Sequence, residues 1–227
     1  AIVPKGIPMP STPYSPAVKA GPWVFVSGQL PTDFSEHGLP PEARRDPLCP
    51  DLQLSELRLQ TEYTYPHIKK ILEAGGSSFE NTVRTDRFGV LEDTPTGHIS
   101  SVTDAWIVRN AYIPESAGRP ASTGMRCSNL PVKSAIFMVE FVAIANDSEW
   151  KKEAITSPRI SHAPAGYSHA IRVGPYVFCS GDIPTDWNQG VAPAAQTNKD
   201  FWYGSDFELQ TRFTIDRLSI ILEDAGS

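Results

Sequence analysis

One carboxylate in this chain stands in a setting that suits acid–base chemistry. Glu140 lies in the segment VEFVAIA and is the only carboxylate of that apolar run. A carboxyl group that is buried beside a ligand has a raised pKa, so it can take up and release a proton near neutral pH. The alternative is a structural strand residue that is paired with a nearby base. The residue pattern alone leaves both interpretations open.

The other residue types that often carry chemistry do not form a recognisable site. The chain has five histidines: His37, His67, His98, His162 and His169. They show no metal-ligand spacing with one another or with cysteine, so the sequence predicts no metal site. It also has no phosphate-binding loop, dinucleotide-binding glycine pattern or GxSxG elbow. Cys127 and Cys179 are expected to be small core residues rather than nucleophiles.

The composition is that of a folded, soluble protein. A hydrophobic fraction of 40%, with five Trp, seven Tyr and ten Phe, can fill real cores. The formal net charge of -6 argues against nucleic-acid binding, which depends on clustered Lys and Arg. No apolar run reaches the roughly 20 residues of a membrane helix, and the first residues lack a signal-peptide core. Three cysteines without a CxxC pair suit a reducing compartment, so we expect a cytoplasmic location.

One block of the sequence occurs twice. YSPAVKAGPWVFVSGQLPTD, from Tyr14, returns from Tyr167 as YSHAIRVGPYVFCSGDIPTD with 12 of 20 positions identical. Its β-branched and aromatic residues around a Gly-Pro turn predict a β-hairpin.

The repeat divides the chain into two units. We expect a first unit over residues 1–146, a polar linker with no strong strand pattern over 147–162, and a second unit over 163–227. Ser227 aligns with Ser77, so the second unit matches only the first half of the first. A hairpin with one helix hardly closes a core, so we expect either a longer native chain or another polypeptide to complete it.

Periodicity predicts the remaining elements of the first unit. Residues 53–74 have apolar positions at helical spacing, followed by a Gly-Gly stop signal. Pro66 within them predicts a kink or a late helix start. A strand is expected over residues 81–91 and a second helix over 99–112, and two more strands in STGMRCSNL and AIFMVEFVAIA. The first unit is thus ββαβαββ.

Several spaced motifs, in this order, resemble the Rid family, also called YjgF. They are YSPAV…VFVSGQLP, ILEAGGSSFENTVRTDRF, RPAST, NLP and VEFVAIA. The match covers nearly all of residues 12–146 and, as a first half, 165–227. The resemblance implies an α+β fold of chorismate-mutase-like ββαβαββ units in tandem, each with a mixed sheet and two helices on one face. It also implies a homo-oligomer with trimeric or pseudo-trimeric packing and pockets between neighbours.

The resemblance also implies roles for particular residues, because family members include enamine/imine deaminases. Glu140 corresponds to the catalytic glutamate that positions water. Tyr14 corresponds to the tyrosine that closes the pocket, and Gly28 to the glycine whose backbone borders the substrate. The alternatives are a packing aromatic and a glycine that allows close strand approach. The reaction needs no cofactor.

The part of the motif that binds the substrate carboxylate departs from the family pattern. The arginine that follows RPA in family deaminases is Ser122 here, while Gly124 falls where backbone groups hold the carboxylate. The candidate replacement cations are Arg84, Arg87, Arg119 and Arg126. Arg87 is the first choice, because it alternates with Thr85 at a position that is usually apolar in the family. The alternative is a surface or interface ion pair.

The resemblance therefore implies a hydrolytic deaminase. We expect it to act on an enamine or imine of a small amino acid or of an unsaturated aminocarboxylate such as 2-aminomuconate, with water positioned by Glu140. The alternative is a noncatalytic ligand-binding or regulatory protein, which the loss of the arginine at position 122 favours. The net charge of -6 argues against ribonuclease activity, which has been proposed for some relatives. We expect neither nucleic acid nor membrane as a partner.

Overall fold

The computed structural model describes most of the chain. The described residues are 1–35, 38–46, 48, 54–90, 100–188, 190–197 and 204–227. His37 and His98 lie outside them, as do the first residue of the predicted first helix and the last residue of the strand predicted over 81–91.

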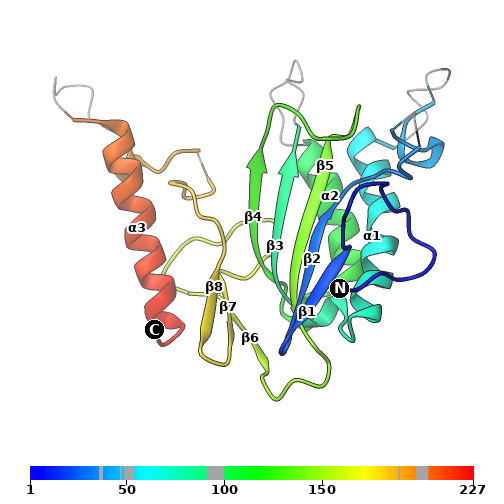
Figure 1. Cartoon of the computed structure of the whole chain (residues 1–227). Helices are drawn as coiled ribbons and strands as arrows, with labels where there is room; N and C mark the ends of the chain where they lie inside the picture. The colour runs from blue at the N-terminus through cyan, green and yellow to red at the C-terminus, as the bar shows by residue number, and fades with distance from the viewer. Residues whose placement is uncertain (36–37, 47, 49–53, 91–99, 189, 198–203) are drawn as a thin grey trace.

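The first unit is built on one five-stranded sheet (Figure 1). Its strands are β1 (Ala17–Ala20), β2 (Trp23–Gln29), β3 (Thr82–Gly89), β4 (Ala121–Arg126) and β5 (Phe137–Ile144). The spatial order is β1-β2-β5-β3-β4, in which β3 and β4 run parallel and the other neighbours run antiparallel. The predicted mixed sheet is confirmed.

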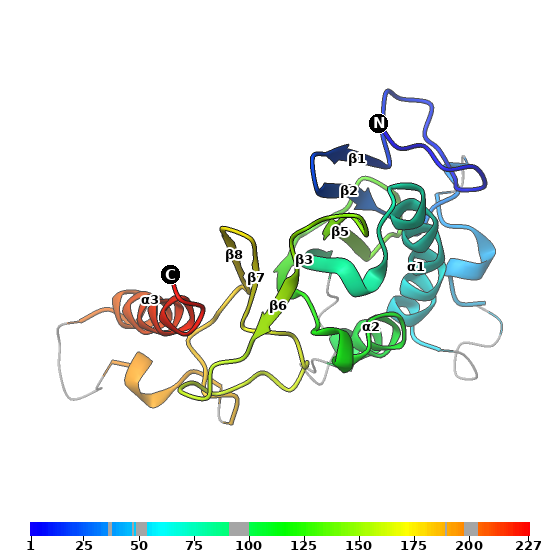
Figure 2. The ribbon, with the colours of Figure 1, turned by 90° about the horizontal axis from the view of Figure 1, so that it is seen from below.

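Two helices, α1 (Glu56–Ala74) and α2 (Ser100–Tyr112), cover one face of this sheet, as Figure 2 shows. The sequence of β5 explains how the core forms. Phe137, Val139 and Phe141 alternate along the strand and are each 1% exposed, packed in the core with helix residues. Alternation points the intervening residues, Glu140 among them, to the opposite face. The predicted ββαβαββ order is confirmed.

The prediction that Pro66 delays the start of the first helix is wrong. Helix α1 begins at Glu56 and continues through Pro66. The Ser55 hydroxyl caps the first turn by accepting a hydrogen bond from the Arg58 backbone N–H at 3.1 Å. The side chain of Gln60, fully buried, also bonds to the segment before β5. Tertiary contacts of the first turns offset the hydrogen bond that proline removes.

The segment after residue 146 contains a strand that the sequence does not predict. β6 (Lys152–Ile155) pairs with β7 (Ala170–Val173), which pairs with β8 (Tyr176–Cys179). β6 therefore lies within residues 147–162, where the sequence shows no strong strand pattern. The polar residues of β6 form a strand because the edge of β7 offers backbone partners, which is a nonlocal cause. The predicted second hairpin, β7–β8, is confirmed.

The second hairpin packs on the first sheet through a small apolar cluster. Val83 and Ala121 of the first unit and Ile171 and Val173 of the second are fully buried in it. Trp23 contacts Tyr176, with ring centroids 5.6 Å apart. These two aromatic residues occupy matching positions of the repeated block, so the two hairpins meet through equivalent side chains.

Matching residues of the repeat make matching local contacts. The Ser27 hydroxyl donates to the Ser15 carbonyl at 2.8 Å, and the Ser180 hydroxyl donates to the Ser168 carbonyl at 2.6 Å. The second unit continues, like the first, into one long helix, α3 (Asp206–Asp224). The order of hairpin, connecting segment and helix is therefore the same in both units.

The two long helices differ in what covers them. In α1, Leu57 is 6% exposed and Tyr65 is 3% exposed, beneath the sheet and α2. Their aligned counterparts in α3, Phe207 and Ile215, are 81% and 55% exposed. The same face is therefore a core face in one unit and a largely open face in the other.

This difference predicts unequal costs for matched substitutions. Tyr65→Ala is expected to lower the free energy of unfolding by about 3–5 kcal/mol, because Tyr65 stacks on Phe79 in the core. Ile215→Ala is expected to change it by less than about 1 kcal/mol, because more than half of the side chain is already in solvent. Urea unfolding of both variants checks the comparison, and equal costs would contradict it.

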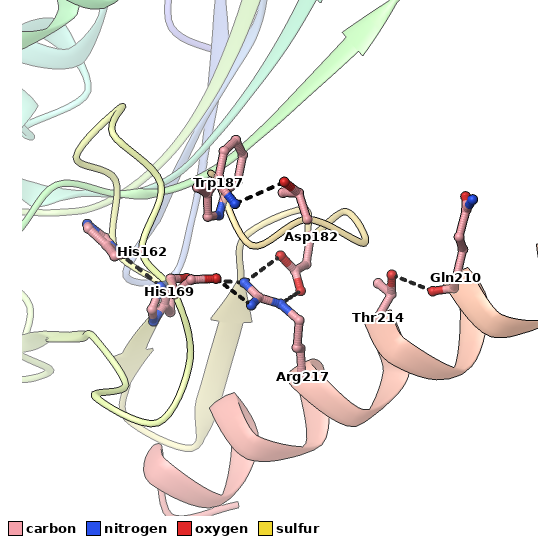
Figure 3. A network of polar contacts seen from close by, with 9 residues as sticks. His162, His169, Asp182, Trp187, Gln210, Thr214 and Arg217 are labelled. Atoms are coloured by element: carbon pink, nitrogen blue, oxygen red, sulfur yellow. Dashed lines mark hydrogen bonds and ion pairs between the residues drawn. The ribbon is translucent and has the colours of Figure 1, made fainter. Parts of the chain in front are cut away.

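A network of polar contacts lies between α3 and the second hairpin (Figure 3). The Ser157 backbone N–H donates to His169 Nδ1 at 3.0 Å, so that nitrogen carries no proton. His169 Nε2 therefore donates to His162 Nδ1, also at 3.0 Å. Burial, with His162 and Arg217 nearby, lowers the pKa of His169 from 6.5 to about 4.

The lowered pKa of His169 predicts acid sensitivity. Its neutral form stabilises the fold fully above about pH 6.5, and this stabilisation is lost as the pH falls toward about 4. His169→Asn keeps an acceptor for Ser157 without the titration, so its stability is expected to vary less over that range. Urea midpoints at about pH 7.5 and about pH 5, on either side of the ordinary histidine pKa, measure the difference. An unchanged pH dependence in the variant would count against this assignment.

Candidate active site

Glu140 lies on the face of the sheet that the helices leave open. Its direct cross-strand neighbour on β3 is Asp86. Asp86 in turn receives two hydrogen bonds from the guanidinium of Arg84, at 2.8 and 3.0 Å. The site therefore holds two carboxylates and one guanidinium, and the cation is already paired with one of the acids.

The surroundings of Glu140 favour its protonated form. Burial raises the pKa of the Glu140 carboxyl above its ordinary value, and the negative charge of Asp86 raises it further. Such a carboxyl is a stronger base when ionised and holds a proton at higher pH, as general acid–base catalysis requires.

Tyr14 and Gly28 lie near this carboxylate. The Tyr14 hydroxyl donates to the Gly28 carbonyl at 3.2 Å, and the Gln29 amide donates to the Tyr14 oxygen at 2.6 Å. A Cβ atom at Gly28 would lie 3.5 Å from Glu140 Oε1 and 3.0 Å from the sulfur of Met138. The absence of a side chain at position 28 therefore leaves room next to the carboxylate.

Gly28 and Glu140 border an open cleft of about 340 Å³. Its lining comprises Val18, Phe25, Val26, Ser27, Gly28, Arg84, Asp86, Glu140, Phe141 and Val142. A cleft of this size accepts a small organic molecule. The mixture of apolar walls with two acids and one arginine suits a ligand with both apolar and polar groups.

The structure places Arg87, Ser122 and Gly124 on the other side of the sheet. Arg87 and Ser122 line a small cavity with Val139, whose side chain points to the helices. Gly124 faces the same way, because a Cβ atom there would lie 2.8 Å from Arg87 Nη2. Strand alternation separates Asp86 from Arg87 in this way. These three predicted substrate-binding residues are thus not brought together with Glu140.

Arg119 also lies away from Glu140, where it ties the two units together. Its guanidinium donates to the Gly166 carbonyl at 3.1 Å and to the Ile113 carbonyl at 3.4 Å. Close by, the Gly181 backbone N–H donates to the Ser122 carbonyl at 3.1 Å. Gly181 is the repeat counterpart of Gly28, so the second hairpin lies along the edge of β4.

Asp86 is the site residue that sequence reasoning missed. The signal was present, since Arg84 and Asp86 alternate along a predicted strand and share one face. Only the pairing of β3 with β5 shows that this face is the one that carries Glu140.

In the described part of the chain, no three His, Cys, Asp or Glu side chains gather in a way that suits a metal ion. Among the described helices, none is long and apolar enough to span a membrane.

Comparison with known proteins agrees with the motifs. The sequence model of the family described as endoribonuclease L-PSP matches residues 5–146. A RutC family protein of Pyrococcus abyssi is 29% identical over 136 residues, which are 60% of this chain and 89% of that protein. A RutC family protein of Pyrococcus horikoshii is 26% identical over 137 residues, or 60% and 90%.

Two solved structures are also similar to this chain. RidA from an Antarctic Psychrobacter species has 25% identity and a TM-score of 0.46, over 63% of this chain and 97% of that one. TdcF of E. coli, solved with bound serine, has 21% identity and a TM-score of 0.48, over 63% and 96%. Because the family model covers most of the chain, including the strand that carries Glu140, this chain belongs to the Rid family, also called YjgF.

Proposed function

We propose that the cleft around Glu140 hydrolyses the C=N bond of an imine, formed directly or from its enamine. The substrate class is a small amino acid derivative or an unsaturated aminocarboxylate such as 2-aminomuconate. The observation that carries the proposal is the position of Glu140, which lies in an open cleft, next to Gly28, with a raised pKa.

The reaction balances with water alone. The Glu140 carboxylate removes a proton from a water molecule as its oxygen bonds to the C=N carbon, and the π electrons of that bond move to nitrogen. The carboxyl then returns the proton to nitrogen, which gives a neutral carbinolamine. Glu140 next takes the hydroxyl proton of the carbinolamine and passes it to the amine, so that the C–N bond breaks and ammonia leaves as the carbonyl forms. The raised pKa of Glu140 supports these proton transfers. No cofactor enters these steps.

Substrate selectivity follows from the charges of the cleft. Arg84 is the cation of the cleft lining, and Asp86 already occupies its guanidinium. We expect weak discrimination in favour of simple 2-imino acids, because a substrate carboxylate has to compete with Asp86 for Arg84. A substrate with an extended apolar part gains more from the walls that Val18, Phe25 and Val142 form.

The test is ammonia release by the complete chain from a series of enzymatically generated enamines. The proposal predicts release above the uncatalysed rate for at least one substrate of the stated class. Rates equal to the uncatalysed rate for every substrate would refute it. RNA cleavage is measured in the same experiment, because the family is described as an endoribonuclease family. The net charge of -6 predicts no RNA cleavage.

A second candidate is a noncatalytic protein that binds a small ligand in the same cleft or has a regulatory role. The serine at position 122 and the pairing of Arg84 with Asp86 favour it. Saturable binding of the enamine series or its carbonyl products, without ammonia release, would select this candidate over the deaminase.

We propose further that residues 163–227 correspond to the first half of a second Rid-like domain, and that chains assemble with trimeric or pseudo-trimeric packing. The contact between Trp23 and its repeat counterpart Tyr176 supports such packing. Light scattering is expected to give a mass well above the 24.9 kDa of a single chain. A clean monomer would contradict the assembly. A cytoplasmic location remains our proposal, supported by the free thiols of Cys127 and Cys179.

A further inference from the structure

A second polar cavity lies on the helix-covered side of the first sheet. Its volume is about 10 Å³, which is room for one guest the size of a water molecule. Its polar lining side chains are Tyr65, Thr85, Arg87, Arg109 and Ser122. Each of them carries a hydrogen-bond donor, and the two guanidiniums can only donate. The cavity therefore has donors on all its polar walls and no carboxylate among them.

Arg87 is a cation of this cavity that lacks a counter-charge among the described residues. Within the described part of the chain, no carboxylate and no hydrogen-bond acceptor pairs with its guanidinium. Arg87 is partly buried, and this partial burial lowers the pKa of its guanidinium by disfavouring the charged form. A partly buried charge without a counter-charge is costly, so the site gains from a guest that supplies a negative charge.

The neighbouring cations do not relieve this cost. Arg109 donates to the carbonyl of Ala165 and, at 2.8 Å, to the side-chain oxygen of Asn110, and both acceptors are neutral. Burial, together with the nearby charges of Arg87 and Arg119, lowers the pKa of Arg109 to about 10. The carboxylate of Glu115 lies 3.9 Å from Arg119 on a side chain that is 88% exposed. The cluster is therefore strongly cationic.

We propose that this cavity binds one small monovalent anion, such as chloride, between the guanidiniums of Arg87 and Arg109. The hydroxyl groups of Tyr65, Thr85 and Ser122 supply further donors. Because Arg109 also holds the Ala165 carbonyl of the second unit, the anion stabilises the junction of the two units. This site is separate from the proposed deaminase cleft, since Arg87 and Asp86 face opposite sides of β3.

The experiment is thermal unfolding of the complete chain in chloride and in gluconate at equal ionic strength. Gluconate is too large for a cavity of this size, so it controls for screening. In chloride the Tm of the wild type is expected to rise with the logarithm of the chloride concentration, by about 5–10 °C when chloride reaches a hundred times its Kd. Arg87→Met is expected to show no such rise, and in gluconate to be at least as stable as the wild type.

The matched control is Arg212→Met, which removes an arginine that is 72% exposed and should keep the full response to chloride. Equal Tm values of the wild type in the two salts would overturn the proposal, as would an undiminished rise in Arg87→Met. Crystals of the wild type grown in bromide give a readout that does not depend on any variant. An anomalous peak in contact with Arg87 and Arg109 supports the site, and its absence overturns it.

Discussion

Glu140→Gln is expected to lower the kcat for ammonia release by about 10²- to 10⁴-fold, the usual contribution of a positioned acid–base group. Glutamine has nearly the same size and still forms hydrogen bonds, but it cannot take a proton from water. The loss is therefore expected in kcat rather than in KM, since the proton transfer belongs to the transition state. Steady-state kinetics on the best substrate of the enamine series measure it.

The stability of this variant serves as its own control. Burial raises the folded-state pKa of Glu140, so the ionised carboxylate costs stability above that pKa, and the cost vanishes as the pH falls through it. Glu140→Gln is therefore expected to be at least as stable as the wild type at neutral pH. Glu208→Gln, on the exposed face of α3, is the matched substitution that should leave kcat unchanged. A Glu140→Gln enzyme with kcat within about twofold of the wild type would assign Glu140 a structural role instead.

Asp182→Ala is expected to lower the free energy of unfolding of the second unit by about 3–5 kcal/mol. Asp182 and Arg217 form an ion pair with side chains 7% and 8% exposed, and the Arg217 Nε lies 2.6 Å from the carboxylate (Figure 3). The remaining donors of Arg217 are bound to the hydroxyl and carbonyl of Ser161, at 2.9 and 3.2 Å. Removing the carboxylate leaves the buried guanidinium of Arg217 without a counter-charge, so the expected cost in stability is large.

The matched control for this variant breaks an exposed pair on the same helix. Glu208→Ala removes the partner of Arg212, and it is expected to cost less than about 1 kcal/mol because both side chains are largely in solvent. Hydrogen exchange along α3, together with urea unfolding, measures both variants. Similar costs for the two would show that the Asp182–Arg217 pair does not hold α3 to the hairpin. Adding Arg217→Met to Asp182→Ala should recover part of the loss, since no buried charge then remains.

Several features of the fold were predictable from local patterns. The alternation of β5 fixes which residues enter the core, and that periodicity is a property of any half-buried strand. The spacing of apolar positions likewise predicts α1, and the repeated block predicts the second hairpin. The strand β6 was not predictable, because its polar residues are held by the backbone edge of β7.

The candidate site divides in the same way. The motif match singled out Glu140, Tyr14 and Gly28, and these lie together because β2 and β5 are neighbours in the sheet. Asp86 entered the site only through the pairing of β3 with β5. The sequence singled out Arg87 as a residue that could bind the substrate carboxylate. Arg87 follows Asp86 directly along β3, so its side chain lies on the opposite face of the sheet.

The sequence by itself thus determined the family, the order of the elements and the residue best suited to acid–base chemistry, because motif spacing and side-chain periodicity are local properties of the chain. Only the tertiary structure decided which strands lie side by side. It thereby decided that Asp86, and not Arg87, shares a face of the sheet with Glu140. It also decided that one long helix is buried while its counterpart lies open. These outcomes depend on contacts between segments far apart in the chain, which no local pattern encodes.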